Sequence, residues 1–227
     1  MSDDAVRDTG DLDALLRRVD PDRWLSSRFV SDRDKRADVV AVYAFDHELA
    51  RAPKVASNPL LGEIRLTWWR EVLDEVYEGR PVRRHPTAQA LARAIRRRSL
   101  PREPLEAMID ARYRELDATP LSVAEALEWA RDTGGLAAEL AARILDPAGD
   151  TAKARGAGSA WALSRRAREQ PVFASTVEKL LGGARTGAKT LSVAAFPAVA
   201  HAALVGRADS EVARRLRLIW AVARGRL

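Results

Sequence analysis

The chain has 227 residues, enough for one substantial hydrophobic core, and 47% of them are hydrophobic, which excludes a wholly disordered protein. It contains no cysteine, so disulfides and thiolate metal sites are excluded. The formal net charge is +6, from 38 basic and 32 acidic residues. Because the two signs are interspersed and no nucleic-acid-binding motif accompanies the arginines, we expect no nucleic acid partner.

The sequence gives no sign of a membrane span or a targeting segment. No run of about 18 apolar residues is present, which argues against a transmembrane helix. Residues 1–15 are acidic and polar, unlike a secretory signal or a transit peptide. We therefore expect a cytoplasmic protein, either free or peripheral to a membrane.

Helical periodicity dominates the chain from end to end. We expect a flexible tail over 1–10 and one helical domain over 11–227. In chain order, helices are expected over 11–19, from 21, over 32–52, 59–79, 86–98, 102–117, 122–145 and 150–169, near 177, and over 191–205 and 209–224. Residues 171–190 are otherwise expected to be irregular. No strand pair with turn signals is found, so the predicted fold class is all-α with a single domain.

Several helix ends carry local signals. Capping or N-terminal signals are found at three helix starts, in Ser31 with Asp34, Asn58 with Pro59, and Ser122 with Glu125. Pro53 should end or kink its helix near Ala52, and Gly79 is a natural residue to follow a helix C-terminus. The helix from Ser122 is expected to continue through Gly134 and Gly135, where missing side chains allow close packing or ligand approach.

Three runs near the N-terminus carry a family resemblance: RWLSSRFV over 23–30, VYAFDHELAR over 42–51 and NPLLGEIRLTWWREVL over 58–73. Together with weaker similarity onward to residue 207, they resemble the squalene/phytoene synthase family of head-to-head prenyl transferases. The resemblance implies an isoprenoid-synthase-like helical bundle around a central cavity. In active members of that family, two aspartate-rich motifs on facing helices hold Mg²⁺ against a prenyl diphosphate.

Both corresponding positions lack those carboxylates here. The first reads ARAPK over 50–54, and the second reads GSAWALSRR over 158–166, with arginines in place of acids. The loss makes Mg²⁺-dependent ionisation of a diphosphate doubtful, so no metal site and no cofactor are expected. Mg²⁺ would be needed only if other carboxylates, such as Asp110, Glu115 and Asp117, replaced the motifs.

A buried carboxylate is expected within the first long helix. Asp46 falls on the apolar face that includes Tyr43, so it needs a partner, for which Arg65 on the next helix is the candidate. Of the adjacent residues Trp68 and Trp69, one is expected in the core and the other at its rim. His47 and His85 are expected at surface or cap positions and His201 in the core, which is too scattered for a metal site.

A second polar group lies on the helix predicted over 102–117. Asp110, Arg114 and Asp117 share one face, and Asp110 with Arg114 is most simply an intrahelical ion pair. A ligand role is the alternative for this group. The candidate ligand or cavity residues are Tyr43, Asp46, Arg65, Trp69, Asp110, Arg114 and Asp117.

The runs AFDHELAR, LLGEIRLTWWREVL and HPTAQALARAIRRRSLP resemble most a branch of the family that lacks the aspartate motifs and includes a mitochondrial assembly factor for respiratory complex I. The leading hypothesis is a non-catalytic synthase-like protein that binds a prenyl diphosphate, a lipid-like ligand or a membrane-associated protein partner, with a role in respiratory-complex assembly. The alternative is an active prenyl transferase that condenses two prenyl diphosphates in isoprenoid, carotenoid or hopanoid biosynthesis.

Overall fold

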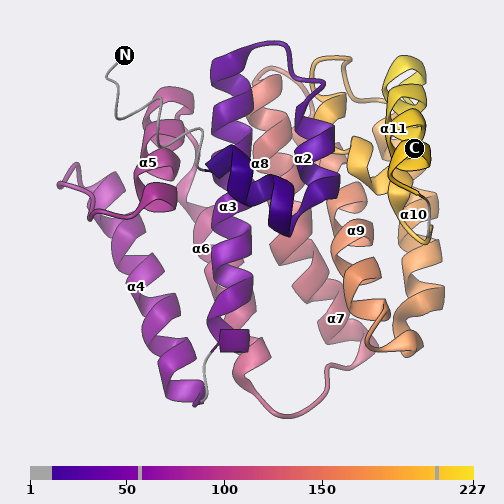
Figure 1. Cartoon of the computed structure of the whole chain (residues 1–227). Helices are drawn as coiled ribbons and strands as arrows, with labels where there is room; N and C mark the ends of the chain where they lie inside the picture. The colour runs from indigo at the N-terminus through magenta and orange to yellow at the C-terminus, as the bar shows by residue number, and fades with distance from the viewer. Residues whose placement is uncertain (1–11, 56–57, 208–209) are drawn as a thin grey trace.

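The computed structural model describes residues 12–55, 58–207 and 210–227, and the regular structure in these ranges is helical without strands (Figure 1). Residues 12–19 form a first helical segment. The α-helices that follow are α2 (Pro21–Ser27), α3 (Arg33–Val55), α4 (Pro59–Tyr77), α5 (Pro86–Arg98), α6 (Arg102–Tyr113), α7 (Val123–Ala130), α8 (Leu136–Leu145), α9 (Arg155–Ala167), α10 (Ala174–Ala188) and α11 (Glu211–Arg224). The all-α prediction is confirmed, whereas the tail expected over 1–10 lies outside the described residues.

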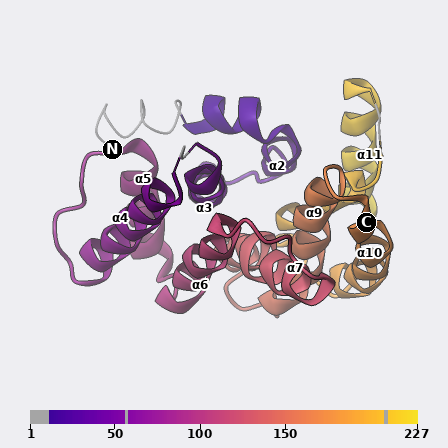
Figure 2. The same cartoon turned by 90° about the horizontal axis from the view of Figure 1, so that it is seen from below.

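The helices form an elongated bundle with α3 running through it. α4 and α5 lie at one end, and α9, α10 and α11 lie at the other (Figure 2). α3 contacts α4, α5, α6 and α8 and contributes fully buried side chains, among them Val42, Phe45 and Leu49. No described helix has the length and apolar character needed to cross a membrane.

The start and end of α3 both differ from the predictions. Asp32, rather than Ser31, caps the helix, because its side chain accepts hydrogen bonds from the backbone N–H groups of Asp34 and Lys35 at 2.9 and 3.0 Å. The helix also runs on through Pro53 to Val55. A proline in the last turn removes only one backbone hydrogen bond close to solvent, so it does not stop the helix at once.

Two other helix starts form as predicted. The Asn58 side chain accepts a hydrogen bond from the Leu60 N–H, and Pro59 is the first residue of α4. Ser122 and Glu125 form a reciprocal capping box at the start of α7. α4 ends at Tyr77, and Gly79 follows with a left-handed backbone, φ +72°.

α7 continues into α8 through a π-helical turn, η2 (Arg131–Gly135), so the predicted unbroken helix is confirmed. The two glycines of this turn let α9 approach at backbone distance. A Cβ on Gly158 of α9 would lie 2.1 Å from the Gly134 carbonyl oxygen, and a Cβ on Gly134 would lie 2.6 Å from the Gly158 oxygen. Glycine is therefore required on both sides of this contact.

The C-terminal third departs most from prediction. Within residues 171–190, where only a short helix near Val177 was expected, the structure has α10, whose buried Val177, Ala184 and Ala188 help it pack against α9. This tertiary contact overrides the low helix propensity of the segment's glycines. The helix expected over 191–205 instead forms two 3₁₀ turns, η5 (Phe196–Ala198) and η6 (Ala200–Leu204). Pro197, which lacks an N–H to donate, explains why no α-helix continues there.

Candidate functional site

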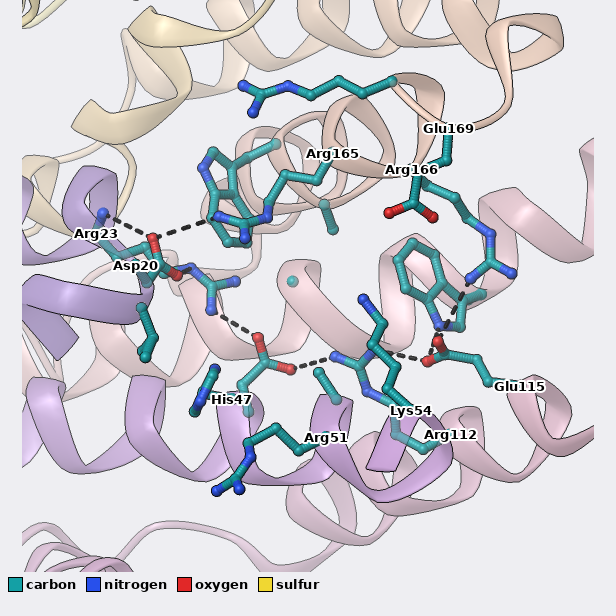
Figure 3. A pocket seen from close by; sticks show the side chains of 18 residues that line it. Asp20, Arg23, His47, Arg51, Lys54, Arg112, Glu115, Arg165, Arg166 and Glu169 are labelled. Atoms are coloured by element: carbon teal, nitrogen blue, oxygen red, sulfur yellow. Dashed lines mark hydrogen bonds and ion pairs between the residues drawn. The ribbon is translucent and has the colours of Figure 1, made fainter. Parts of the chain in front are cut away.

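A pocket of about 420 Å³ opens between α2, α3, α6, α7 and α9 (Figure 3). Its walls carry seven cationic and four anionic side chains, an excess of three positive charges. The cations are Arg23, Arg51, Lys54, Arg112, Arg165, Arg166 and Arg168, and the anions are Asp20, Asp46, Glu115 and Glu169. This composition favours an anionic occupant.

Asp46 is the centre of the buried ion network beneath this pocket. Its carboxylate accepts hydrogen bonds from Arg23 Nη1 of α2 at 2.6 Å and from Arg112 Nη2 of α6 at 2.8 Å. Arg112 Nη1 also donates to Glu115 at 2.7 Å, and Arg166 Nη1 lies 3.5 Å from Glu115 Oε2. The network therefore links α2, α3, α6 and α9 through charged groups (Figure 3).

The pKa values in the network follow from burial and charge. Burial raises the pKa of Asp46, but Arg23 and Arg112 outweigh it and hold this pKa at about 2. At Asp20 burial dominates over Arg23 and Arg165, and the pKa is raised. Asp46 is thus ionised at neutral pH and compensates the two buried guanidinium groups.

Several buried donors of the residues that line the pocket have no hydrogen-bond partner, although Arg23 Nε lies 3.8 Å from Asp20 Oδ2. The buried atoms concerned are Arg23 Nε and Nη2, Arg112 Nε, Arg166 Nε and Trp161 Nε1. The Arg23 guanidinium carbon lies 3.8 Å from the Trp161 ring centroid, whereas Arg112 and Arg166 both lie beside Glu115 and Trp129. Buried donors are normally paired, so these atoms distinguish the lining from an ordinary protein interior.

The two segments expected to hold Mg²⁺ in active relatives meet at this pocket. Arg51 and Lys54 line it from the end of α3, and Arg165 and Arg166 line it from α9. Two carboxylates of the lining, Asp46 and Glu115, already bind arginine. Among the described residues no three acidic, histidine or cysteine side chains are placed to hold a metal ion. The side chains present therefore do not fit Mg²⁺.

The structure brings only some of the predicted site residues together. Asp46 lines the pocket, and Tyr43 is buried nearby, with the Arg23 guanidinium 4.8 Å from its ring centroid. The predicted pairing of Asp46 with Arg65 is wrong, since Asp46 binds arginines of α2 and α6. Arg65 instead lines a separate pocket of about 350 Å³, together with Trp69.

The predicted polar face at the end of α6 is not formed. α6 ends at Tyr113 and the next residues form a 3₁₀ turn, and Asp110 and Arg114 bind other side chains instead of each other. Asp110 pairs with Arg70 of α4, while Arg114 pairs with Glu125 at 2.9 Å. Asp117 is exposed, with a 3.4 Å contact to Arg114. Neither Asp110 nor Asp117 lines the pocket.

The predictions for Trp68, Trp69, His85 and His201 fit the structure, whereas His47, expected at a surface or cap position, is half-buried within α3 and lines the pocket. Trp69 is buried and Trp68 half-buried, while His85 occupies the residue before α5. His201 is fully buried, and neither ring nitrogen has a hydrogen-bond partner. Burial and the nearby Arg23 lower the pKa of His201 well below 6.5.

Arg112 was not among the predicted site residues, although its position on a helix face of buried residues could have indicated it. Leu105, Met108, Ile109 and Arg112 are spaced as one helix face, and all four are buried. The reasoning that singled out Asp46 on the face of α3 would therefore also select Arg112. No comparable pattern marks Arg23, which lies in the short helix α2.

Both the sequence and the fold of this chain resemble those of known proteins. The sequence pattern of the squalene/phytoene synthase family matches residues 16–172, more than half of the chain. The chain belongs to the squalene/phytoene synthase family. It superposes on a ligand-bound dehydrosqualene synthase with a TM-score of 0.74, covering 97% of both chains at 15% identity. A squalene synthase from Alicyclobacillus acidocaldarius gives a TM-score of 0.69, covering 99% of this chain and 97% of that one at 15% identity. These two likenesses concern the fold.

Sequence similarity points to a different group of relatives. Over 103 residues the chain is 32% identical to NADH dehydrogenase (ubiquinone) complex I assembly factor 6 of Bos taurus and 30% identical to that of Homo sapiens. The match covers 45% of this chain and 30% of each relative, so the chain spans less than a third of the length of these curated relatives.

Proposed function

We propose that this protein is a non-catalytic member of the family that binds a prenyl diphosphate, or a similar phosphate-bearing lipid, through arginines instead of Mg²⁺. The carrying observation is the excess of three positive charges among the side chains that line the pocket, with arginines at the positions expected to hold acids. Guanidinium groups present paired N–H donors whose spacing matches phosphate oxygens. A diphosphate group supplies both the negative charge and the acceptors that this pocket lacks.

The loss of catalysis is inferred from what the carboxylates do. Ionisation of an allylic diphosphate in the family depends on metal ions held by acids on facing helices. Here Asp46 and Glu115 bind arginines, and Arg51, Lys54, Arg165 and Arg166 stand at the pocket walls. The alternative function, condensation of two prenyl diphosphates, would need a metal site formed by Asp110, Glu115 and Asp117, of which only Glu115 lines the pocket.

A second candidate function is assembly of a respiratory complex with a membrane-associated protein partner. It is favoured by the 30–32% identity to complex I assembly factor 6 from two mammals, against 15% to the synthases of known structure. Ligand binding and assembly are compatible, because an occupied pocket could stabilise the bundle that the partner recognises.

The ligand proposal is tested by calorimetric titration with farnesyl diphosphate. Arg165→Gln removes a cation that lines the pocket, and Arg96→Gln removes an exposed arginine of α5 that does not. We expect the first variant to bind about tenfold more weakly, the magnitude of losing one charged hydrogen bond, and the second to bind like the wild type. Equal affinity in both variants would place the ligand elsewhere.

A further inference from the structure

α11 carries an apolar surface that faces away from the rest of the protein. Its four large exposed hydrophobic residues are each more than half exposed: Val212, Leu216, Ile219 and Trp220. The opposite side of the helix holds Leu218 and Ala221, both buried, where α11 packs on η6 and α2. The helix is therefore anchored by one face and presents a second apolar face to the surroundings.

The exposed apolar residues form one stripe. At about 100° per residue, the four side chains fall within an arc of about 100° around the helix. Arg215 lies at one edge of this stripe and Arg224 at the other, both exposed. The Arg224 guanidinium carbon lies 3.8 Å from the Trp220 ring centroid, so cation and apolar residue form one continuous surface.

The charge of this region is predominantly positive, although Arg214 pairs with Asp22 of α2. Residues 211–227 contain five arginines and a single acidic residue, Glu211, which pairs with Arg215. A second copy of the chain is a poor occupant, because a two-fold contact through this stripe would bring arginine-rich edges together. An anionic surface complements it.

We propose that α11 docks on the surface of an anionic lipid bilayer and lies in the plane of the headgroups. Its apolar stripe would enter the boundary with the acyl chains, while the arginines on both edges bind lipid phosphates. Tryptophan at this position suits the interface, since its ring is amphipathic. A helix of 14 residues spans about 21 Å, too short to cross a hydrocarbon core of about 30 Å. This inference is independent of the ligand proposed for the pocket.

The test is co-sedimentation of the full chain with vesicles. One set contains only phosphatidylcholine, and the other contains equal parts of phosphatidylcholine and phosphatidylglycerol. We expect binding to the anionic set, weakened by salt, because the arginine contacts are screened. Binding that is equal on both sets, or absent from both, would overturn the proposal.

Two matched variants locate the docking surface. Ile219 and Ile64, on α11 and α4 respectively, are 52% and 55% exposed, so replacing either by Gln should leave the fold intact, as circular dichroism can verify. We expect Ile219→Gln to weaken binding to the anionic vesicles about tenfold and Ile64→Gln to leave it unchanged. Binding unaffected by Ile219→Gln, or a dimer that this substitution dissociates without any vesicle binding, would refute it.

Discussion

Replacing Asp46 by Asn removes the negative charge at the centre of the buried network and preserves its shape. Arg23 and Arg112 would then lose their shared carboxylate, although their side chains are only 1% and 5% exposed. Leaving a buried ion without its partner costs about 3–5 kcal/mol. For a chain of this size, that loss lowers the melting temperature by roughly 10 °C.

Thermal unfolding followed by circular dichroism measures this effect. The matched control is Asp110→Asn, because Asp110 also pairs with an arginine but its side chain is 59% exposed. We expect the control to lose less than about 1 kcal/mol. Inorganic pyrophosphate should raise the melting temperature more in Asp46→Asn than in the wild type, since the two arginines then need an anion.

The pH dependence gives a second readout of the same group. The folded pKa of Asp46, about 2, lies below its ordinary value of 3.8, so its contribution is complete above that value. This contribution, on the order of 2 kcal/mol, is lost as the pH falls from about 4 through 2. Asp46→Asn should lack that part of the acid destabilisation. If Asp46→Asn proves as stable as Asp110→Asn at neutral pH, the reasoning about the network is refuted.

Four further substitutions, one of them a control, test other parts of the structure. Burial lowers the pKa of His201, so the stability of the wild-type protein should fall as the pH drops below about 6.5. Urea titrations at two pH values should show a smaller fall in the His201→Phe variant. An equal fall in both proteins would contradict this. Gly158→Ala should lower the free energy of unfolding by about 1–3 kcal/mol, because its Cβ would overlap the Gly134 carbonyl. Gly182→Ala, where no atom lies within 4 Å of the added Cβ, should raise it by about 0.5–1 kcal/mol. Similar melting temperatures for the two variants would argue against the close helix contact. Ser122→Ala should lose about 1 kcal/mol in the same assay through loss of the cap, and no loss would show that the cap is replaceable.

Local signals in the sequence were sufficient to place many of the helices. Asn58 with Pro59, and Ser122 with Glu125, start their helices as expected, because capping depends on residues a few positions apart. Only a short helix near Val177 was predicted within α10, since the glycines of this segment weaken intrinsic helix propensity and its stability comes from packing against α9. Such tertiary contacts leave no short-range pattern.

The candidate site could likewise be predicted only in part from the sequence. Periodicity alone indicated that Asp46 would be buried, and it is 5% exposed. Its partners could not be read from spacing, because Arg23 lies 23 residues before it and Arg112 lies 66 residues after it. Arg65 of α4 was the wrong choice, because its side chain lines a separate pocket together with Trp69.

The most direct test of the central proposal is calorimetric titration of the wild-type protein with farnesyl diphosphate, first with Mg²⁺ and then with EDTA. Arginine-mediated binding predicts the same affinity in both conditions, without formation of a condensed product. Binding that disappears in EDTA would contradict the proposal and favour a metal-dependent prenyl transferase. Absence of binding in both conditions would also contradict it and would leave assembly with a protein partner as the function to pursue.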